Sequence, residues 1–332
     1  MLVRSSTYAP PPLLANGHLQ TLVASLLRRI DFAYDRRERI DTTDGDFLDL
    51  DWAAARPDAA SSRVAVLSHG LEGSADRSYM RGMARALTRR GWDVCAWNLR
   101  GCSGAPNRHA ATYHSGKTED LARVVDHVLD RGYATAALVG FSLGGNLTLK
   151  YLGEQGAAVD DRIRGAAAFS VPVDLKASSR QIGRATNWHY TQYFLRSLGR
   201  KIRRKAEQHP DAVRTGALRQ VRTLRDFDDA YTAPLNGFRD ADTYYRAASS
   251  KPLLSAIAVP TLLVNAANDP FLAASCYPTD RAAGHPYLTL EVPPSGGHVG
   301  FVTLDGSGEY WSERRAASFL AVASRTPASA PE

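Results

Sequence analysis

Cysteine is scarce in this 332-residue chain. Its three cysteines, Cys95, Cys102 and Cys276, are unevenly spaced, and no CxxC pair or cluster of cysteine and histidine accompanies them. Disulfide frameworks, redox motifs and zinc sites depend on such spacings. The sequence therefore predicts none of these, and we expect no metal and no organic cofactor.

Long apolar runs are also missing. No stretch approaches the roughly 20 apolar residues that a membrane span needs, and residues 1–17 lack the charged start and apolar run of a signal peptide. We therefore expect a soluble, cytoplasmic protein. Hydrophobic residues make up 44% of the chain, which is enough for a full-sized core in one catalytic domain with an insertion.

Basic residues are concentrated in one segment. The formal net charge is +7, but the segment from Lys176 to Lys251 carries 16 Lys or Arg against 7 Asp or Glu. The rest of the chain is therefore close to neutral. The basic character belongs to one segment, and the partner that it suits depends on where that segment lies.

Short apolar runs alternate with amphipathic helical stretches along most of the chain. This alternation is typical of βα units around a mostly parallel sheet flanked by helices. Helices are expected at Tyr79–Arg90 and Thr118–Arg131, each followed by a glycine. The expected strands are Phe47–Ala53, Val64–Ser68, Asp93–Asn98, Ala136–Gly140, Ala166–Val171, Thr261–Ala266 and Tyr287–Val292.

The alternation stops after Val173 and resumes at Val259. So long a connection is either a disordered linker or an inserted helical lid, and its many aromatic residues favour the lid. The predicted organisation is an N-terminal extension packed on the core (1–35), the core (36–175 and 256–324), a helical lid (176–255) and a disordered tail (325–332).

A nucleophile motif follows one of the expected strands. Residues 136–145 read AALVGFSLGG, so a buried strand runs into Gly-x-Ser-x-Gly and then a helix expected at Asn146–Gly153. The turn is so sharp that side chains at Gly140 and Gly144 would collide, and it exposes the hydroxyl of Ser142. We predict that Ser142 is a nucleophile. The alternative is a tight glycine-rich turn with an incidental serine.

A serine nucleophile needs an imidazole base and a carboxylate that orients it. Where Gly-x-Ser-x-Gly joins a strand of a parallel sheet to a helix, the triad residues follow one another in the chain order Ser, acid, His. This order favours Asp269, directly after one strand, and His298, in a glycine-rich loop after the next. Asp269 could instead be an ordinary turn residue before a proline, and Asp174 is the reserve acid. His285 precedes the last strand and is expected to be a surface turn residue.

An oxyanion hole requires two backbone N–H donors. The residue after the nucleophile, Leu143, supplies one, and the loop after the early strand, His69-Gly70-Leu71-Glu72-Gly73, offers the N–H of Leu71 as the other. His69 stands at the wrong place in the chain order for a base. We expect it to bind the loop backbone instead.

Six separated blocks together resemble a known family. They are the NGHLQT block at 16–21, HGLEG at 69–73, NLRGCSG at 98–104, YHSG at 113–116, the Gly-x-Ser-x-Gly turn at 140–144 (the nucleophile elbow), and GGHVGF at 296–301. They look like the YheT/EMB8 group of α/β-hydrolases, which is related to the ABHD1/2/3 lipases. The resemblance implies the α/β-hydrolase fold and a carboxylic-ester hydrolase whose triad falls on Ser142, Asp269 and His298.

Some relatives are described with an acyltransferase-like His-x4-Asp box. No histidine in this sequence is followed by Asp at that spacing; His114 has Glu119 there instead. The missing box argues against an acyltransferase. We expect His18, Tyr113 and His114 to be structural, because polar loop residues often satisfy the backbone; a direct catalytic role is the alternative.

The resulting prediction is a serine esterase or lipase-like enzyme that forms an acyl-enzyme, with a small-molecule or lipid ester as its substrate. A thioesterase or amidase would use the same groups. A lipid- or partner-binding protein without catalysis is the alternative from another class. Its working surface would be the lid.

One stretch of the lid combines basic and apolar residues. As a helix it would place an apolar stripe beside a cationic face, which suits an anionic lipid surface. A solvated face is the plainer interpretation, and no recognition motif for nucleic acid accompanies the charge. The cations are Arg196, Arg200, Lys201, Arg203, Arg204 and Lys205; the apolar residues are Tyr190, Tyr193, Phe194, Leu195 and Leu198.

Overall fold

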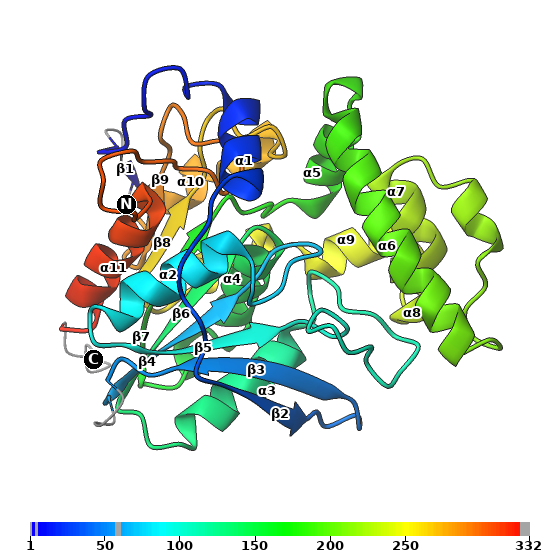
Figure 1. The fold of residues 1–332 in the computed structure, drawn as a ribbon, viewed down its shortest axis with the longest axis horizontal. Coiled ribbons are helices and arrows are strands. Elements are labelled where there is room, and N and C mark those ends of the chain that lie inside the picture. The colour runs from blue at the N-terminus through cyan, green and yellow to red at the C-terminus, as the bar shows by residue number, and fades with distance from the viewer. Residues whose placement is uncertain (1, 4–5, 57–60, 326–332) are drawn as a thin grey trace.

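The computed structural model describes residues 2–3, 6–56 and 61–325, which form one sheet with helices on both faces (Figure 1). The predicted tail lies outside the described residues except for its first residue. The strands are β1 (Leu2–Val3), β2 (Arg36–Asp41), β3 (Phe47–Ala53), β4 (Arg63–Ser68), β5 (Asp93–Asn98), β6 (Thr135–Phe141), β7 (Ile163–Phe169), β8 (Thr261–Val264) and β9 (Leu288–Glu291).

The described strands follow the order β1-β9-β8-β7-β6-β4-β5-β3-β2. All neighbours are parallel from β1 to β5, and β3 and β2 pair antiparallel at the far edge. The central strands are buried over nearly their whole length, as expected for a parallel sheet covered on both faces. The predicted mostly parallel α/β sheet is confirmed.

Helices cover the two faces of the sheet. Apolar side chains of α2 and α11 pack on one face, and those of α3 and α4 pack on the other. Because successive turns of each helix bring apolar residues to one side, burial supplies most of their stability. The helices outside the segment 175–256 are α1 (Gly17–Leu26), α2 (Ser78–Thr88), α3 (Thr118–Leu129), α4 (Leu143–Gln155), α10 (Thr279–Ala282) and α11 (Trp311–Ala323).

Two details differ from the sequence-based expectations. The edge strand Arg36–Asp41 was not expected, because most of its side chains are charged and only Ile40 is buried, as is common at a sheet edge. The helix after the nucleophile motif begins at Leu143 rather than Asn146. Ser142 is therefore the N-cap of this helix. Its first turn contains Gly144 and Gly145, and the pattern of apolar residues does not mark these glycines as helical.

The segment 175–256 forms helices and short helical turns beside the sheet, and it carries two small apolar clusters of its own. In Figure 1 these helices lie together on the right, beyond the carboxyl ends of the strands. The α-helices are α5 (Leu175–Ile182), α6 (Trp188–Gln208), α7 (Leu224–Phe227), α8 (Ala233–Leu235) and α9 (Ala241–Ala248).

Candidate active site

Ser142 stands at the turn between β6 and α4 with φ 54° and ψ −119°. This backbone conformation is strained for a residue with a side chain. A Cβ on Gly144 would lie 2.4 Å from the carbonyl oxygen of Ser68, and one on Gly140 would lie 2.5 Å from that of Gly144. The two glycines are therefore sterically required, and the motif adopts the sharp elbow that its spacing indicates.

The structure brings Ser142, His298 and Asp269 together in one chain of hydrogen bonds. Nε2 of His298 lies 2.9 Å from Oγ of Ser142, and Nδ1 lies 2.9 Å and 3.1 Å from the two carboxylate oxygens of Asp269. The Asp269 side chain is fully buried and that of His298 is 10% exposed. With its proton on Nδ1, the imidazole leaves Nε2 free to accept the serine proton.

The loop that carries His298 is held by residues for which the sequence predicts no such role. The backbone N–H of His298 donates to Oγ1 of Thr21 at 2.8 Å, and that of Val299 donates to Oγ of Ser170 at 2.8 Å. The ring of Phe271 packs on the imidazole with centroids 4.2 Å apart. Thr21 lies in the NGHLQT block, so this block supports the candidate base from the opposite end of the chain.

The two predicted oxyanion donors lie beside the elbow. Leu71 and Leu143 both line the cavity that contains Ser142, and a Cβ on Gly70 would lie 3.1 Å from that of Ser142. Among the described residues, neither the Leu71 nor the Leu143 amide donates to another protein group. Leu143 is also the first residue of α4, where the helix dipole favours negative charge.

Two of the alternative residues have structural partners of their own. His69 is fully buried; its Nδ1 lies 2.8 Å from the carbonyl oxygen of Gly70, and its Nε2 accepts from the Leu99 N–H. Burial lowers the pKa of His69 to about 4, so it stays neutral. The reserve acid Asp174 caps α5 by accepting from the Ala177 N–H.

The remaining alternatives also have contacts within the fold. His285 accepts backbone N–H groups near the start of β9. His114 packs edge-on against Phe238 and Tyr244, and burial lowers its pKa to about 3. His18 stacks on the ring of Tyr190.

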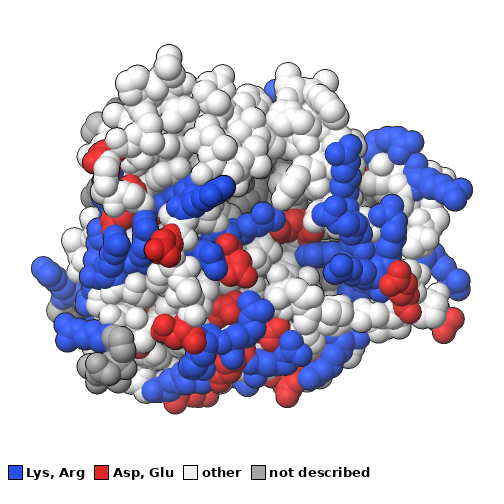
Figure 2. Space-filling model, in the orientation of Figure 1, with Lys and Arg blue, Asp and Glu red and all other residues white. Residues whose placement is uncertain are grey.

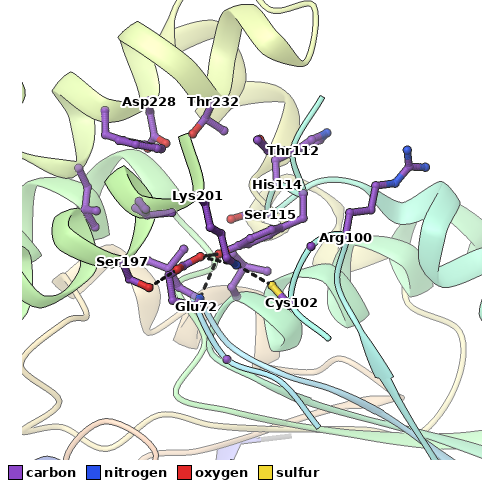
Figure 3. Close-up of a pocket in the computed structure, with 18 of the residues that line it drawn as sticks. Glu72, Arg100, Cys102, Thr112, His114, Ser115, Ser197, Lys201, Asp228 and Thr232 are labelled. Atoms are coloured by element: carbon purple, nitrogen blue, oxygen red, sulfur yellow. Dashed lines mark hydrogen bonds and ion pairs between the residues drawn. The ribbon is translucent and has the colours of Figure 1, made fainter. Parts of the chain in front are cut away.

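A cavity of about 400 Å³ opens at Ser142 between the core loops and the helical segment 175–256. Its walls combine apolar side chains such as Leu198 and Phe227 with charged ones. Figure 3 shows two of the charged ones, Glu72 and Lys201. The volume falls within the range of roughly 300–1,000 Å³ that is usual for small-molecule sites. Within the described parts of the chain, no group of His, Cys, Asp and Glu side chains is placed to hold a metal ion.

The cationic face expected on the lid is divided in two by the fold. Lys205 is buried and donates to the carbonyl oxygens of Asn107 and His109, and Lys201 forms an ion pair with Glu72 in the cavity wall. The expectation that all six cations share one outward face is therefore wrong. The four arginines are exposed, and Figure 2 shows basic side chains gathered over this part of the segment 175–256.

Searches of known proteins agree with this fold. The model of the family described as the alpha/beta hydrolase fold matches residues 65–303. The protein named "Putative esterase YheT" of Escherichia coli is 36% identical over 90% of this chain and 88% of its own. Phospholipase ABHD3 of Mus musculus is 31% identical over 90% of this chain and 74% of its own.

The solved esterase Pf2001 of Pyrococcus furiosus superposes with a TM-score of 0.58 and 18% identity, over 96% of this chain and 98% of that one. At that identity the likeness supports the fold alone. The sequence relatives support more, because they include the groups that the six motif blocks resemble. The chain belongs to the α/β-hydrolase fold family and, within it, to the group that contains YheT, EMB8 and the ABHD3 phospholipases.

Proposed function

We propose that this protein is a serine carboxylic-ester hydrolase that works through an acyl-enzyme. The observation that carries the proposal is the continuous hydrogen-bonded chain from the Ser142 hydroxyl through His298 to the buried Asp269 carboxylate. Relatives named as an esterase, a phospholipase and a monoacylglycerol lipase support ester hydrolysis as the reaction class.

In the proposed mechanism, Oγ of Ser142 attacks the ester carbonyl carbon while Nε2 of His298 takes the hydroxyl proton. The carbonyl oxygen becomes an oxyanion beside the free N–H groups of Leu71 and Leu143. His298 then returns the proton to the departing alkoxide, which leaves as an alcohol. Water, activated by the same imidazole, attacks the acyl-enzyme and releases the carboxylic acid, which restores the Ser142 hydroxyl.

A fluorophosphonate probe tests the nucleophile directly. We expect the wild-type protein to form a covalent adduct, and peptide mapping by mass spectrometry to place it on Ser142. Heat-denatured protein serves as the control, since labelling requires the assembled hydrogen-bonded chain. Absence of labelling in the native protein would favour a non-catalytic binding protein. Full esterase activity in Ser142→Ala would show that Ser142 is not the nucleophile.

We propose acyl esters, including lipid esters, as the substrates. The cavity at Ser142 has more apolar than polar wall and is closed on one side by the lid, so the lid helices determine which acyl groups fit. Hydrolysis of nitrophenyl esters of increasing chain length, monoacylglycerols and phospholipids would define the class. Thioesters and anilides in the same series would separate an esterase from a thioesterase or amidase.

The exposed arginines suggest that the lid also contacts anionic membranes. Arg196, Arg200, Arg203 and Arg204 lie on α6, which also exposes Trp188 and Tyr193; basic and aromatic groups together suit an anionic lipid surface. The described helices include none that is long and apolar enough to cross a membrane. Sedimentation with phosphatidylserine vesicles, compared with phosphatidylcholine vesicles, tests this contact, and Arg200→Glu/Arg203→Glu should abolish any difference.

A further inference from the structure

The loop that supplies the Leu71 N–H is a strained turn. The N–H of Gly73 donates to the carbonyl oxygen of Gly70 at 3.0 Å, and Glu72 has φ 54°. A positive φ at the third position is the mark of a type II turn, which ordinarily places glycine there. A glutamate holds this conformation only where its surroundings impose it.

Two residues outside α6 hold the backbone of Glu72 on both sides. Its N–H donates to the hydroxyl of the buried Tyr113 at 3.0 Å, and its carbonyl oxygen accepts from Nη2 of Arg77 at 2.7 Å. The Tyr113 hydroxyl in turn donates to Oε1 of Glu72 at 2.7 Å. The side-chain carboxylate and the backbone of the turn are therefore held by the same neighbour.

The lid supplies the other partners of this carboxylate. Nζ of Lys201 lies 2.8 Å from Oε1 of Glu72, and Oγ of Ser197 donates to Oε2 (Figure 3). Tyr193 accepts from Arg77 at 3.2 Å. Tyr193, Ser197 and Lys201 follow one another at intervals of four residues, so they form one face of α6. That face lies on the strained turn.

The buried carboxylate of Glu72 can stay ionised only because of these contacts. Its side chain is only 2% exposed. Burial by itself raises the pKa of Glu72, but Lys201, Ser197 and Tyr113 outweigh burial and hold the pKa below its ordinary value. A buried carboxylate without its cation is strongly unfavourable. If α6 moves away, the carboxylate must turn toward water, and the turn loses the interaction that fixes its side chain.

We infer that Glu72 is a positioning residue through which the closed lid helix α6 completes the oxyanion hole. It holds the turn that aims the Leu71 N–H, and it does so only while Lys201 and Ser197 neutralise and bind its carboxylate. This inference rests on the proposed function, since it deepens the role given there to Leu71. The lid would thus set the efficiency of the acyl-transfer step as well as which substrate enters.

Glu72→Gln, Lys201→Met and the double variant test the inference on a short-chain nitrophenyl ester. Removing an oxyanion donor outright lowers kcat about 10²–10³-fold. Here the donor is displaced rather than removed, so we expect each single variant to lose roughly 10–100-fold in kcat, with KM changed less than about twofold. The double variant should be no slower than the slower single variant, because both changes break one interaction.

Two comparisons separate positioning from a merely structural effect. Lys201→Arg keeps the positive charge and should recover most of kcat. Arg225→Met removes an ion pair with Asp242 inside the lid, away from the turn, and should leave kcat unchanged. Thermal unfolding confirms that each variant is folded. Wild-type kcat in Glu72→Gln and Lys201→Met, additive losses, or a loss confined to KM would overturn the inference.

Amide hydrogen exchange of the peptide covering residues 70–77 tests the same coupling without any turnover. We expect faster exchange in Lys201→Met than in wild type and Arg225→Met. If Ser142→Ala retained full activity, the proposed function would fail. Unchanged exchange in Lys201→Met would overturn the coupling itself, so the two failures are distinguishable.

Discussion

Replacing Asp269 by Asn tests the candidate hydrogen-bonded chain at its least exposed member. In the wild-type protein, Oδ1 of Asp269 accepts from the Phe271 N–H at 2.8 Å, and both carboxylate oxygens face Nδ1 of His298. An asparagine can keep the bond to Phe271 with its carbonyl oxygen. Its NH2 group then faces Nδ1 and must donate to it.

The expected consequence is the wrong tautomer of His298. With Nδ1 accepting, the imidazole proton moves to Nε2, which lies 2.9 Å from Oγ of Ser142. Nε2 then has no lone pair for the serine proton. We expect kcat to fall by about 10³–10⁴-fold, which corresponds to about 4–5 kcal/mol of activation free energy. The fold should persist, because size and the bond to Phe271 are retained.

Steady-state kinetics on a short-chain nitrophenyl ester, with thermal unfolding as the check on folding, measures the effect. Asp174→Asn is the matched control, because asparagine caps a helix as well as aspartate does and Asp174 binds the first turn of α5. We expect it to keep wild-type kcat. An Asp269→Asn variant that retained more than a tenth of wild-type kcat would refute the assignment of Asp269.

Three further predictions concern stability. Gly144→Ala places a methyl group 2.4–2.5 Å from two backbone carbonyl oxygens, so the free energy of unfolding measured in urea should fall by about 3 kcal/mol. In the control Gly216→Ala the methyl group enters open space, and the free energy of unfolding should change by less than about 0.5 kcal/mol. Equal losses in the two variants would contradict the steric argument. Burial raises the pKa of Asp228 to about 6 from 3.8, so the folded state binds an extra proton between these values and loses stability as pH rises through them. Asp228→Asn should therefore be more stable than wild type by about 1–2 kcal/mol at pH 8. Chemical unfolding at pH 4 and pH 8 measures the difference, and a variant less stable than wild type at pH 8 would contradict the prediction. Arg100→Met removes the buried partner of Asp120 and should cost about 3–5 kcal/mol in urea unfolding, whereas an unchanged midpoint would show that the ion pair contributes nothing.

The local features of the candidate site could be predicted from the sequence. Gly140 and Gly144 flank Ser142 because a tight turn excludes side chains there, and this restriction acts between neighbours in the chain. Asp269 and His298 follow buried strands, and the carboxyl ends of parallel strands share one edge of the sheet. Short-range sterics and strand order were therefore enough to propose the three residues that the fold places in contact.

Other parts of the site depend on contacts between distant segments. Thr21 binds the backbone of His298 across 277 positions, and no local pattern encodes such a pairing. Lys201 looked like one more cation on an outward helical face, yet packing turns it toward Glu72. The sequence by itself determined the sheet, the elbow and the order of the triad candidates, because these follow from strand burial and turn sterics. The tertiary structure alone decided which lid residues reach the oxyanion loop, because the rotation of α6 depends on how its whole surface packs.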